Sequence, residues 1–395
     1  MTEPQTTTFS RVDNSIFYTA FDYPPLDPAR LEIRLLKIDA YGFDRHELIS
    51  NVSLRHTPAF AALSYVCGPP TNTVPITVGG LKFNAFASLA AAIAEVRLCW
   101  QRAFPGRELL LWTDQVCINQ SDDDERSQQV SSMRDIYSQA KYTLISLPAF
   151  IDVGYDFQDW SACKEWLVQQ RSNMHATSEF VRNRDAEDPT MQAVQPSSQL
   201  VKDIAIAVHE VYALGKSEWW TRAWVFQEFM VSESALFMVK PFFVPWEDIF
   251  ELLQLYYSSW DLFSQWRYDM EDYLNQEQVQ IRAHMHLKGL IPYCGSSCDF
   301  CHILYDMYTD YHEKAWDYFD SLPKQYSDVL TAFAGHYIGF MSVFEDKQNL
   351  GLQLPLSTVM KRSRTRKTSE PRDKVYAYLG LLRIPALSCP ITGKG

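Results

Sequence analysis

The order of apolar and polar residues predicts alternating strands and helices over the first 240 positions. Alternation at 31–35, with apolar residues continuing to 38, is typical of a strand with one buried face. Short apolar runs of the fully buried type follow at 60–66, 109–114 and 142–148. Apolar residues recur at helical spacing in 86–100 and 121–140. Strands that alternate with helices imply right-handed crossovers, so this pattern predicts a mostly parallel sheet.

Two local signals add detail to this pattern. The Gly79-Gly80 pair interrupts an alternating stretch at 74–83 and predicts a hairpin turn. Ser121, followed by Asp124 three residues later, is a capping signal for the next helix. The acidic residues at 122–125 suit the positive end of that helix.

The rest of the chain reads as mainly helical, apart from one strand at 235–239. Helices are predicted near 158–170, 200–214, from about 221, and from 246 onward. We interpret 1–22 as a loose N-terminal arm, about 150–215 as an insertion, and 236–395 as a mainly helical C-terminal region. The predicted class is α/β, with a small, mostly parallel sheet.

Composition narrows the function classes. The chain has 395 residues, of which 47% are hydrophobic and 21% are charged, so it can build the core of two domains. Its net charge of −12 argues against a broad nucleic-acid face. No stretch of eighteen apolar residues predicts a membrane span, and the polar N-terminus is unlike a secretory signal. Eight scattered cysteines favour reduced thiols and a cytoplasmic protein.

Five sequence blocks carry a resemblance to a known family. In chain order they are IRLLKI, ALSYVCG, LWTDQVCINQSDDDERSQQVSSMRDIYSQA, WWTRAWVFQE and PRDKVYAYLGLL. They resemble the fungal heterokaryon incompatibility (HET) domain, which we place at 23–235 with its core at 60–230. The family usually has tryptophan where this chain has Cys67. Many relatives continue beyond the last block, so the sequence is interpreted as a short member or a truncated product.

The resemblance implies a role in fungal non-self recognition and programmed cell death. The HET core is also similar, more distantly, to Toll/interleukin-receptor (TIR) domains, which are flavodoxin-like and some of which cleave NAD. The TIR block with a catalytic glutamate has a W-x-x-x-E spacing, which Trp224 and Glu228 reproduce. This second resemblance implies NAD as a substrate, protein partners in incompatibility signalling, and a homo-oligomer in which neighbouring subunits complete the site.

The chemistry of NAD cleavage gives these residues roles. The reaction passes through an oxocarbenium-like state that a carboxylate can stabilise, which is the role expected of Glu228. Trp219, Trp220 and Trp224 are candidates for a wall that stacks on nicotinamide. Ligands of doubly wound sheets bind at the carboxyl ends of the strands. The candidate nucleotide-binding residues are therefore Ser64, Tyr65, Asp114, Asn119 and Trp224.

Each of these residues has a structural alternative. Glu228 can instead pair with Arg222 or Arg134 in a structural network. Asn119 and Gln120 can shape the turn through bonds to the backbone. Cys117 is more typical of a small buried residue than of a nucleophile. A non-catalytic signalling module is therefore the competing function. The sequence contains no glycine-rich phosphate loop of the kind that would indicate a kinase or an ATPase.

Two further motifs remain open. Cys294, Cys298 and Cys301 have a C-x3-C-x2-C spacing, similar to the cluster loop of radical S-adenosylmethionine enzymes, although no barrel of repeated units surrounds it. With His302 the same thiolates form a candidate zinc site, against the simpler interpretation of a metal-free loop. The basic run at 361–367 is a candidate nuclear address or acidic-partner site, or a solvated loop.

Overall fold

A computed structural model provides the coordinates. It describes residues 12–21, 23–39, 45–147, 156–183 and 196–259, and the shorter stretches 262–263, 265–266, 268–270, 345, 347–348, 366–368, 377–378 and 381. The chain divides into two compact units. The first unit comprises 1–150, 216–249 and 336–395, and the second comprises 151–215 and 250–335.

A single sheet of nine strands, counted within the described residues, organises the first unit. The strands are β1 (Glu32–Ile38), β2 (Arg45–Ser53), β3 (Ala61–Ser64), β4 (Thr73–Val78), β5 (Leu81–Phe86), β6 (Leu109–Trp112), β7 (Tyr142–Ile145), β8 (Ala235–Val239) and β9 (Phe242–Pro245). Their order across the sheet is β5-β4-β2-β1-β6-β3-β7-β8-β9. The α/β class predicted from the sequence is confirmed.

Parallel pairing is concentrated in the centre of this sheet. Strands β6, β3, β7 and β8 pair in parallel, with Ala61 of β3 opposite both Leu111 of β6 and Tyr142 of β7. Among the flanking pairs, β1–β2, β1–β6, β4–β5 and β8–β9 are antiparallel and β2–β4 is parallel. The expectation of a mostly parallel sheet is therefore wrong for the sheet as a whole, because hairpin and edge strands extend it on both sides.

The central strands follow a known topology. In chain order β3, β6, β7 and β8 are the first to fourth parallel strands, so their spatial order is second, first, third, fourth. This is the order of flavodoxin-like doubly wound sheets. Short apolar strands buried on both faces, such as β3, are what such a sheet requires.

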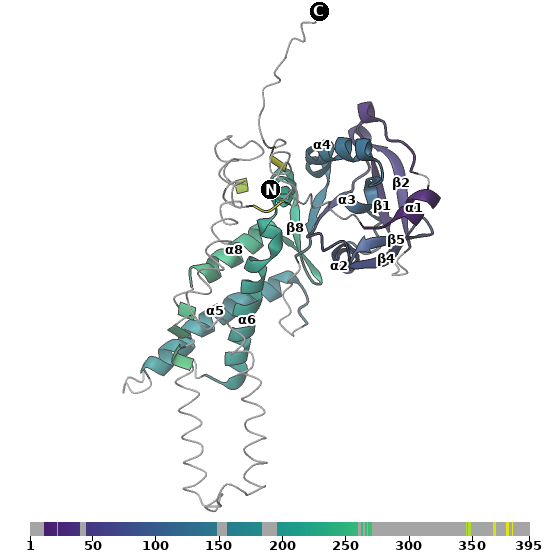
Figure 1. The fold of residues 1–395 in the computed structure, drawn as a ribbon. Helices are drawn as coiled ribbons and strands as arrows, with labels where there is room; N and C mark the ends of the chain where they lie inside the picture. The colour runs from purple at the N-terminus through teal and green to yellow at the C-terminus, as the bar shows by residue number, and fades with distance from the viewer. Residues whose placement is uncertain are drawn as a thin grey trace, which may run out of the picture. The chain divides into compact units, whose positions relative to one another are not determined.

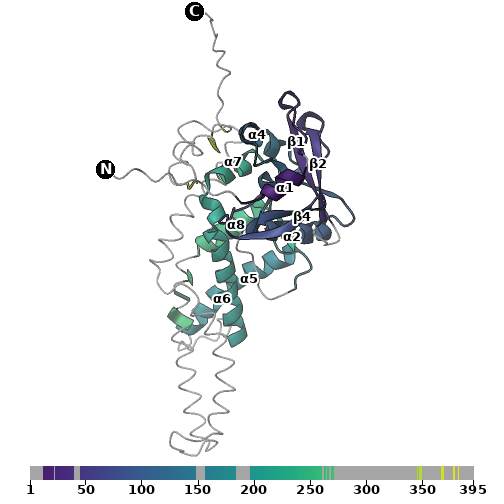
Figure 2. The same ribbon diagram turned by 45° about the vertical axis from the view of Figure 1, so that its right-hand side comes forward.

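Helices cover both faces of the sheet. Helix α2 (Ala87–Ala103) packs on β4, β5, β8 and β9, while α4 (Asp123–Gln139) and α7 (Ala223–Val231) pack on one another. Figure 2 shows α4 and α7 together, with α2 on the opposite side of the strands. The short helix α3 (Asp114–Cys117) lies against β1, as Figure 1 also shows.

The predicted N-cap of α4 was wrong by one residue. The N-cap of α4 is Asp122, whose carboxylate accepts bonds from the amides of Asp124 and Glu125. Ser121 is not the cap, because its hydroxyl donates instead to Asn119 Oδ1 at 2.6 Å. The adjacent acidic residue has the longer reach and takes the capping position.

The N-terminal arm is not loose throughout. Residues Ser15–Ala20 form helix α1, and Phe17 is buried against Phe83 of β5 with ring centroids 5.0 Å apart. The Asn14 side chain accepts a bond from the Asn84 amide and donates to the Asn84 carbonyl. These bonds satisfy backbone groups of β5 at the edge of the sheet.

The second unit is helical in its described part. It contains α5 (Trp160–Asn183), α6 (Ser198–Lys216, whose last residue falls in the first unit) and most of α8 (Trp246–Tyr257). The Tyr256 hydroxyl donates to the Leu167 carbonyl at 2.7 Å, joining α8 to α5. The predicted insertion at 150–215 belongs to this unit, and the predicted region 236–395 is shared between the two units.

Among the residues that the structure describes, no helix is long and apolar enough to cross a membrane.

Candidate functional site

The carboxyl end of β3 lies where the sheet changes direction. The chain passes from β3 to β6 on one side and then from β6 to β7 on the other side of β3. Flavodoxin-like sheets bind their ligands at such a switch point, outside the carboxyl ends of the strands. Ser64 is the last residue of β3, and its carbonyl accepts a bond from the Ser146 amide, which follows β7.

A buried polar cluster is built on Ser64. Its hydroxyl donates to the carboxylate of Glu228 and accepts a bond from Trp219 Nε1 at 2.8 Å. Ser64 is 1% exposed and Glu228 is 7% exposed. Glu228 comes from α7, and Trp219 comes from the 3-10 turn η3 (Glu218–Thr221) just before it. The structure therefore brings Ser64 and Glu228, two residues predicted separately as site candidates, together at this strand end.

Burial governs the protonation of Glu228. Loss of solvent raises the pKa of its carboxyl from the ordinary 4.5 to about 7. The hydrogen bond from Ser64, the charge of Arg222 and a bond from Tyr137 act in the opposite direction, and the charge of Asp114 raises the pKa further. A carboxyl with this pKa exchanges its proton near neutral pH, which suits acid–base chemistry.

A second carboxylate, Asp114, lies at the end of β6. The Tyr65 hydroxyl donates to Asp114 Oδ1 at 3.1 Å, and the Gln115 amide donates to the same oxygen at 2.7 Å. Arg222 Nη1 donates to the Tyr65 carbonyl at 2.9 Å. Burial raises the pKa of Asp114, while the bonds from Tyr65 and Gln115 and the charge of Arg222 lower it. Arg222 thus supplies positive charge to both carboxylates.

Cys67 belongs to the same cluster. Burial and the charge of Asp114 raise the pKa of its thiol, whereas the charge of Arg222 and hydrogen bonds with Arg222 and Tyr65 lower it. The net shift is upward, so the neutral thiol is favoured. Cys67 therefore lies beside Asp114 and Arg222.

The tryptophans behave differently from the predicted stacking wall. Trp219 and Trp220 are both buried, and each packs on Phe237 of β8, with ring centroids 5.7 and 5.5 Å away. Trp224 is half-buried, and the indole that contacts Ser64 is that of Trp219. Trp219 and Trp220 therefore support the cluster from within the core.

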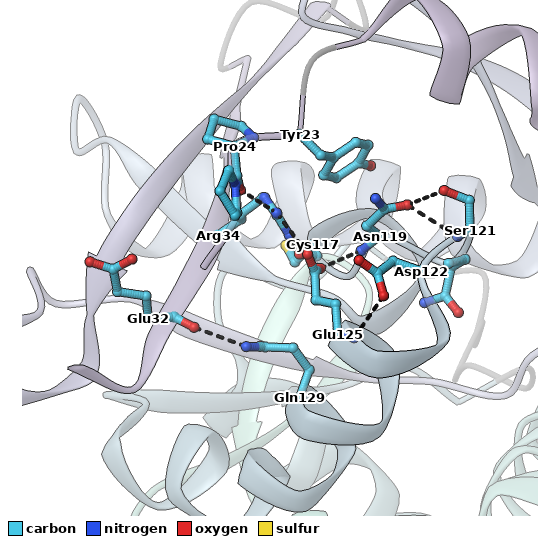
Figure 3. A network of polar contacts seen from close by, with 12 residues as sticks. Tyr23, Pro24, Glu32, Arg34, Cys117, Asn119, Ser121, Asp122, Glu125 and Gln129 are labelled. Carbon is cyan, nitrogen blue, oxygen red and sulfur yellow. Dashed lines mark hydrogen bonds and ion pairs between the residues drawn. The ribbon is translucent and has the colours of Figure 1, made fainter. Parts of the chain in front are cut away.

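Asn119 lies in a different set of contacts. Its side-chain Oδ1 accepts bonds from the Ser121 backbone amide and hydroxyl. The Asn119 backbone amide donates to Glu125 Oε1 at 2.7 Å (Figure 3). Gln120 Nε2 donates to the Asp114 carbonyl at 2.9 Å. These contacts are the turn-shaping bonds that were the alternative to nucleotide binding.

A second buried network surrounds Arg34 of β1. Its guanidinium bonds both oxygens of Glu125, at 2.6 and 2.9 Å, and donates to the carbonyls of Pro24 and Cys117 (Figure 3). It also lies 4.6 Å from the centre of the Tyr23 ring. This network ties the N-terminal segment to α3 and α4.

Tyr137 is a site residue that the sequence interpretation missed. It was assigned only to the apolar stripe of α4, yet its hydroxyl donates to the Leu63 carbonyl at 2.9 Å and lies beside Glu228, whose pKa it lowers. A phenol in an apolar stripe needs a buried polar partner, and that requirement was the available signal.

The cysteine predictions divide into two groups. The Cys117 thiol is buried, donates to the Leu111 carbonyl at 3.7 Å, and has a pKa raised by burial to about 12, as expected of a small core residue. The candidate zinc residues Cys294, Cys298, Cys301 and His302 lie outside the described residues. Within the described part, no group of three or more His, Cys, Asp or Glu side chains is arranged to hold a metal ion.

Comparison with known proteins shows a family to which this part of the chain is similar. Residues 60–228 match the family model described as heterokaryon incompatibility protein (HET). The chain is 28% identical, over 245 residues, to heterokaryon incompatibility protein 6, OR allele, of Neurospora crassa, covering 55% of this chain and 34% of the relative. It thus spans about a third of that relative's length. No solved structure matches the chain. The matched range begins just before Ser64 and ends at Glu228, so both residues lie in the part of the chain that is similar to the heterokaryon incompatibility (HET) family.

Proposed function

We propose that this chain acts in fungal non-self recognition and triggers programmed cell death by hydrolysing NAD. The HET domain and the name of the Neurospora crassa relative support the first part of the proposal. The second part depends on the residues at the carboxyl end of β3. Protein partners in incompatibility signalling belong to the same proposal.

One observation carries the enzymatic part. Glu228 is a carboxyl with a pKa of about 7 at the switch point of a flavodoxin-like sheet, bonded by Ser64. Cleavage of the nicotinamide–ribose bond develops positive charge on the ribose, which the ionised carboxylate stabilises. Because its partners are hydroxyls with a cation nearby, Glu228 keeps charge available for that state.

The second carboxylate has a supporting role. Asp114 bonds the Tyr65 hydroxyl, and Arg222 supplies positive charge to both acidic residues. We propose that this side of the cluster holds a ribose hydroxyl of NAD, with Ser64 and Tyr65 lining the approach. Trp224 remains a candidate for contact with nicotinamide.

The test is nicotinamide release from NAD by purified protein, at low and high protein concentration. Glu228→Gln keeps the size of the side chain and removes its charge, and we expect release to fall at least about 100-fold. Glu95→Gln is the matched control. Burial also raises the Glu95 pKa to about 7, and Ser146 donates to it at 3.0 Å, yet it lies on α2 outside the cluster. Equal loss in both variants would contradict the role of Glu228.

Assembly is part of the proposed mechanism. TIR-type domains act when neighbouring subunits complete the site, so release per chain is expected to rise with protein concentration. Size-exclusion chromatography of the same samples relates activity to the homo-oligomer. A monomer that cleaves NAD at the full rate would refute this part and leave the role of Glu228 intact.

A second candidate, a non-catalytic signalling module, is favoured by burial. Glu228 is 7% exposed, and its carboxylate already bonds Ser64 and Tyr137 close to Arg222. If neither the wild type nor Glu228→Gln releases nicotinamide under oligomer-promoting conditions, this candidate replaces the enzyme. Elemental analysis of the same protein tests the zinc prediction for the loop at 294–302.

A further inference from the structure

Helix α7, which carries Glu228, is anchored at its N-terminal end by residues far along the chain. The Ala223 amide donates to the Lys367 carbonyl at 3.1 Å, and the Lys367 amide donates to the Thr221 carbonyl at 2.7 Å. The first amides of a helix have no partner within it, and the Arg222 side chain does not cap this one. The Lys367 backbone therefore fills that place.

Arg366 strengthens the same anchor. It is 6% exposed, its Nη1 donates to the Trp220 carbonyl at 2.7 Å and to the Arg222 carbonyl at 3.3 Å, and its guanidinium lies 4.8 Å from the centre of the Phe226 ring. For Arg366 the interpretation as part of a solvated loop is wrong. Residues 361–365 of the basic run lie outside the described residues.

The other end of α7 has a similar anchor. Lys347 Nζ donates to the carbonyls of Phe229 and Ser232, both at 2.6 Å, and lies 4.7 Å from the centre of the Phe229 ring. Carbonyls at a helix C-terminus have no partner within the helix, and a cation also complements the negative end of its dipole. Lys347 and Arg366 are both contributed by the late segment of the first unit.

These anchors act on the geometry of the cluster. Arg222 is held at both ends, because Arg366 bonds its carbonyl and its own guanidinium bonds the Tyr65 carbonyl. That arrangement places its charge close to Glu228 and Asp114. Phe229, whose carbonyl is bonded by Lys347, directly follows Glu228 in the chain. Backbone displacement at either anchor would move the carboxylate, the cation or both.

We propose that Arg366 and Lys347 form a two-point clamp on α7 and are positioning residues for Glu228 and Arg222. The catalytic consequence rests on the proposed function. The geometric consequence does not, because the distance from Arg222 to Glu228 can be followed without any substrate. Lys347 and Arg366 thus act on the site, although the family match ends at residue 228.

The experiment follows the indole N–H of Trp219 by NMR during a pH titration, with the signal assigned through Trp219→Phe. This indole bonds Ser64, which bonds Glu228, so its shift reports ionisation of the carboxyl. The groups that face Glu228 are Ser64 from β3, Tyr137 from α4, Asp114 from α3, and Arg222 before α7. In Arg366→Ala the Arg222 charge is displaced, and the midpoint is expected to rise by about one pH unit.

Three further variants make the outcome decisive. Arg366→Lys keeps a donor for the Trp220 carbonyl, so its midpoint should rise by less than half as much as that of Arg366→Ala. Lys347→Met should raise the midpoint by a smaller amount, and Arg55→Ala, which removes an exposed arginine, should leave it unchanged. A folded Arg366→Ala protein with an unchanged midpoint would overturn the clamp. If Arg366→Ala does not fold, an unchanged midpoint in Lys347→Met would overturn it.

Nicotinamide release is measured on the same samples to separate the two proposals. If no protein cleaves NAD but the midpoint shifts as expected, the clamp stands and the enzymatic proposal fails. If the wild type cleaves NAD and Arg366→Ala retains both full release and an unchanged midpoint, the clamp alone is rejected.

Discussion

Two buried carboxylates of this protein have opposite surroundings. Glu125 bonds the Arg34 guanidinium with both oxygens, and Arg34 is 0% exposed with further bonds to backbone carbonyls. Glu228 bonds a serine hydroxyl and lies near, rather than on, a guanidinium. The first pair is a closed ionic contact, whereas the second leaves a carboxyl whose pKa is about 7.

The difference lies in what the partners of each carboxylate allow. A buried cation needs a matched anion, and removing either leaves an uncompensated charge. A buried carboxyl held by hydroxyls loses its charge at a smaller free-energy cost, because it can take up a proton. The Arg34–Glu125 pair therefore joins elements of the fold, whereas Glu228 can exchange a proton near neutral pH.

The largest effect is expected from breaking the closed pair. Arg34→Met leaves Glu125 buried without its cation and should lower the free energy of unfolding by about 3–5 kcal/mol. Urea denaturation followed by circular dichroism measures this change. Arg126→Ala removes an exposed pair with Asp123 on the same helix and serves as the control, with little expected change. Similar losses in both variants would show that burial does not distinguish the pairs.

The next effect is a pH dependence of stability that arises from Glu228. The native state holds a proton on this group up to about pH 7, whereas the unfolded chain releases it near 4.5. The free energy of unfolding therefore falls as pH rises between these values, by about 1–3 kcal/mol. Glu228→Gln cannot release a proton and should lose this part of the slope. Urea midpoints between pH 4.5 and 8 give the comparison, and parallel slopes would contradict it.

A smaller effect is expected from the hydroxyl partner. The bond from Ser64 lowers the pKa of Glu228, so Ser64→Ala should raise it by about one unit, measured by ¹³C NMR of the carboxyl. Ser146→Ala is the matched control, because that hydroxyl bonds Glu95 instead. It should raise the pKa of Glu95 and leave that of Glu228 unchanged. A Glu228 midpoint that moves equally in both variants would exclude a specific role for Ser64.

The smallest effect is expected from an exposed pair. Lys37 Nζ lies 2.7 Å from Glu108, with both side chains largely in solvent. Water and salt screen such charges, so Lys37→Met should leave the thermal midpoint unchanged within error. A clear loss of stability would mean that pairing, rather than burial, explains the Arg34 result.

Local features of the fold were predictable from the sequence. The hairpin turn at Gly79-Gly80 has φ of 56° and 80°, which glycine adopts readily, and a Cβ at Gly79 would lie 2.5 Å from the Phe21 ring. Helix α2 was predicted because its apolar residues recur at helical spacing within one continuous stretch of sequence. Strand β2 was missed, since its residues are largely polar and it is defined by pairing with β1 and β4.

The site was predictable in its residue types but not in its contacts. Ser64 and Glu228 are 164 positions apart, and their meeting depends on where α7 packs over β3. The same packing decides that Trp219 rather than Trp224 reaches Ser64. Spacing along one helix cannot reveal such a choice, because it depends on the turn η3 before the helix. Tyr137 was missed because its hydrogen-bond partner, the Leu63 carbonyl, comes from another element of the fold.

The long separation between α7 and its N-terminal anchor has a consequence during protein synthesis. Trp220 and Arg366 are 146 positions apart, although their atoms are 2.7 Å apart in the folded chain. A ribosome that adds roughly 5–20 residues per second needs roughly 7–30 s to cover that interval. For this period a nascent chain has its central strands and α7 but lacks the arginine that anchors the N-terminal end of that helix. A cell that makes such a protein therefore gains a delay between translation of the glutamate and completion of the geometry around it.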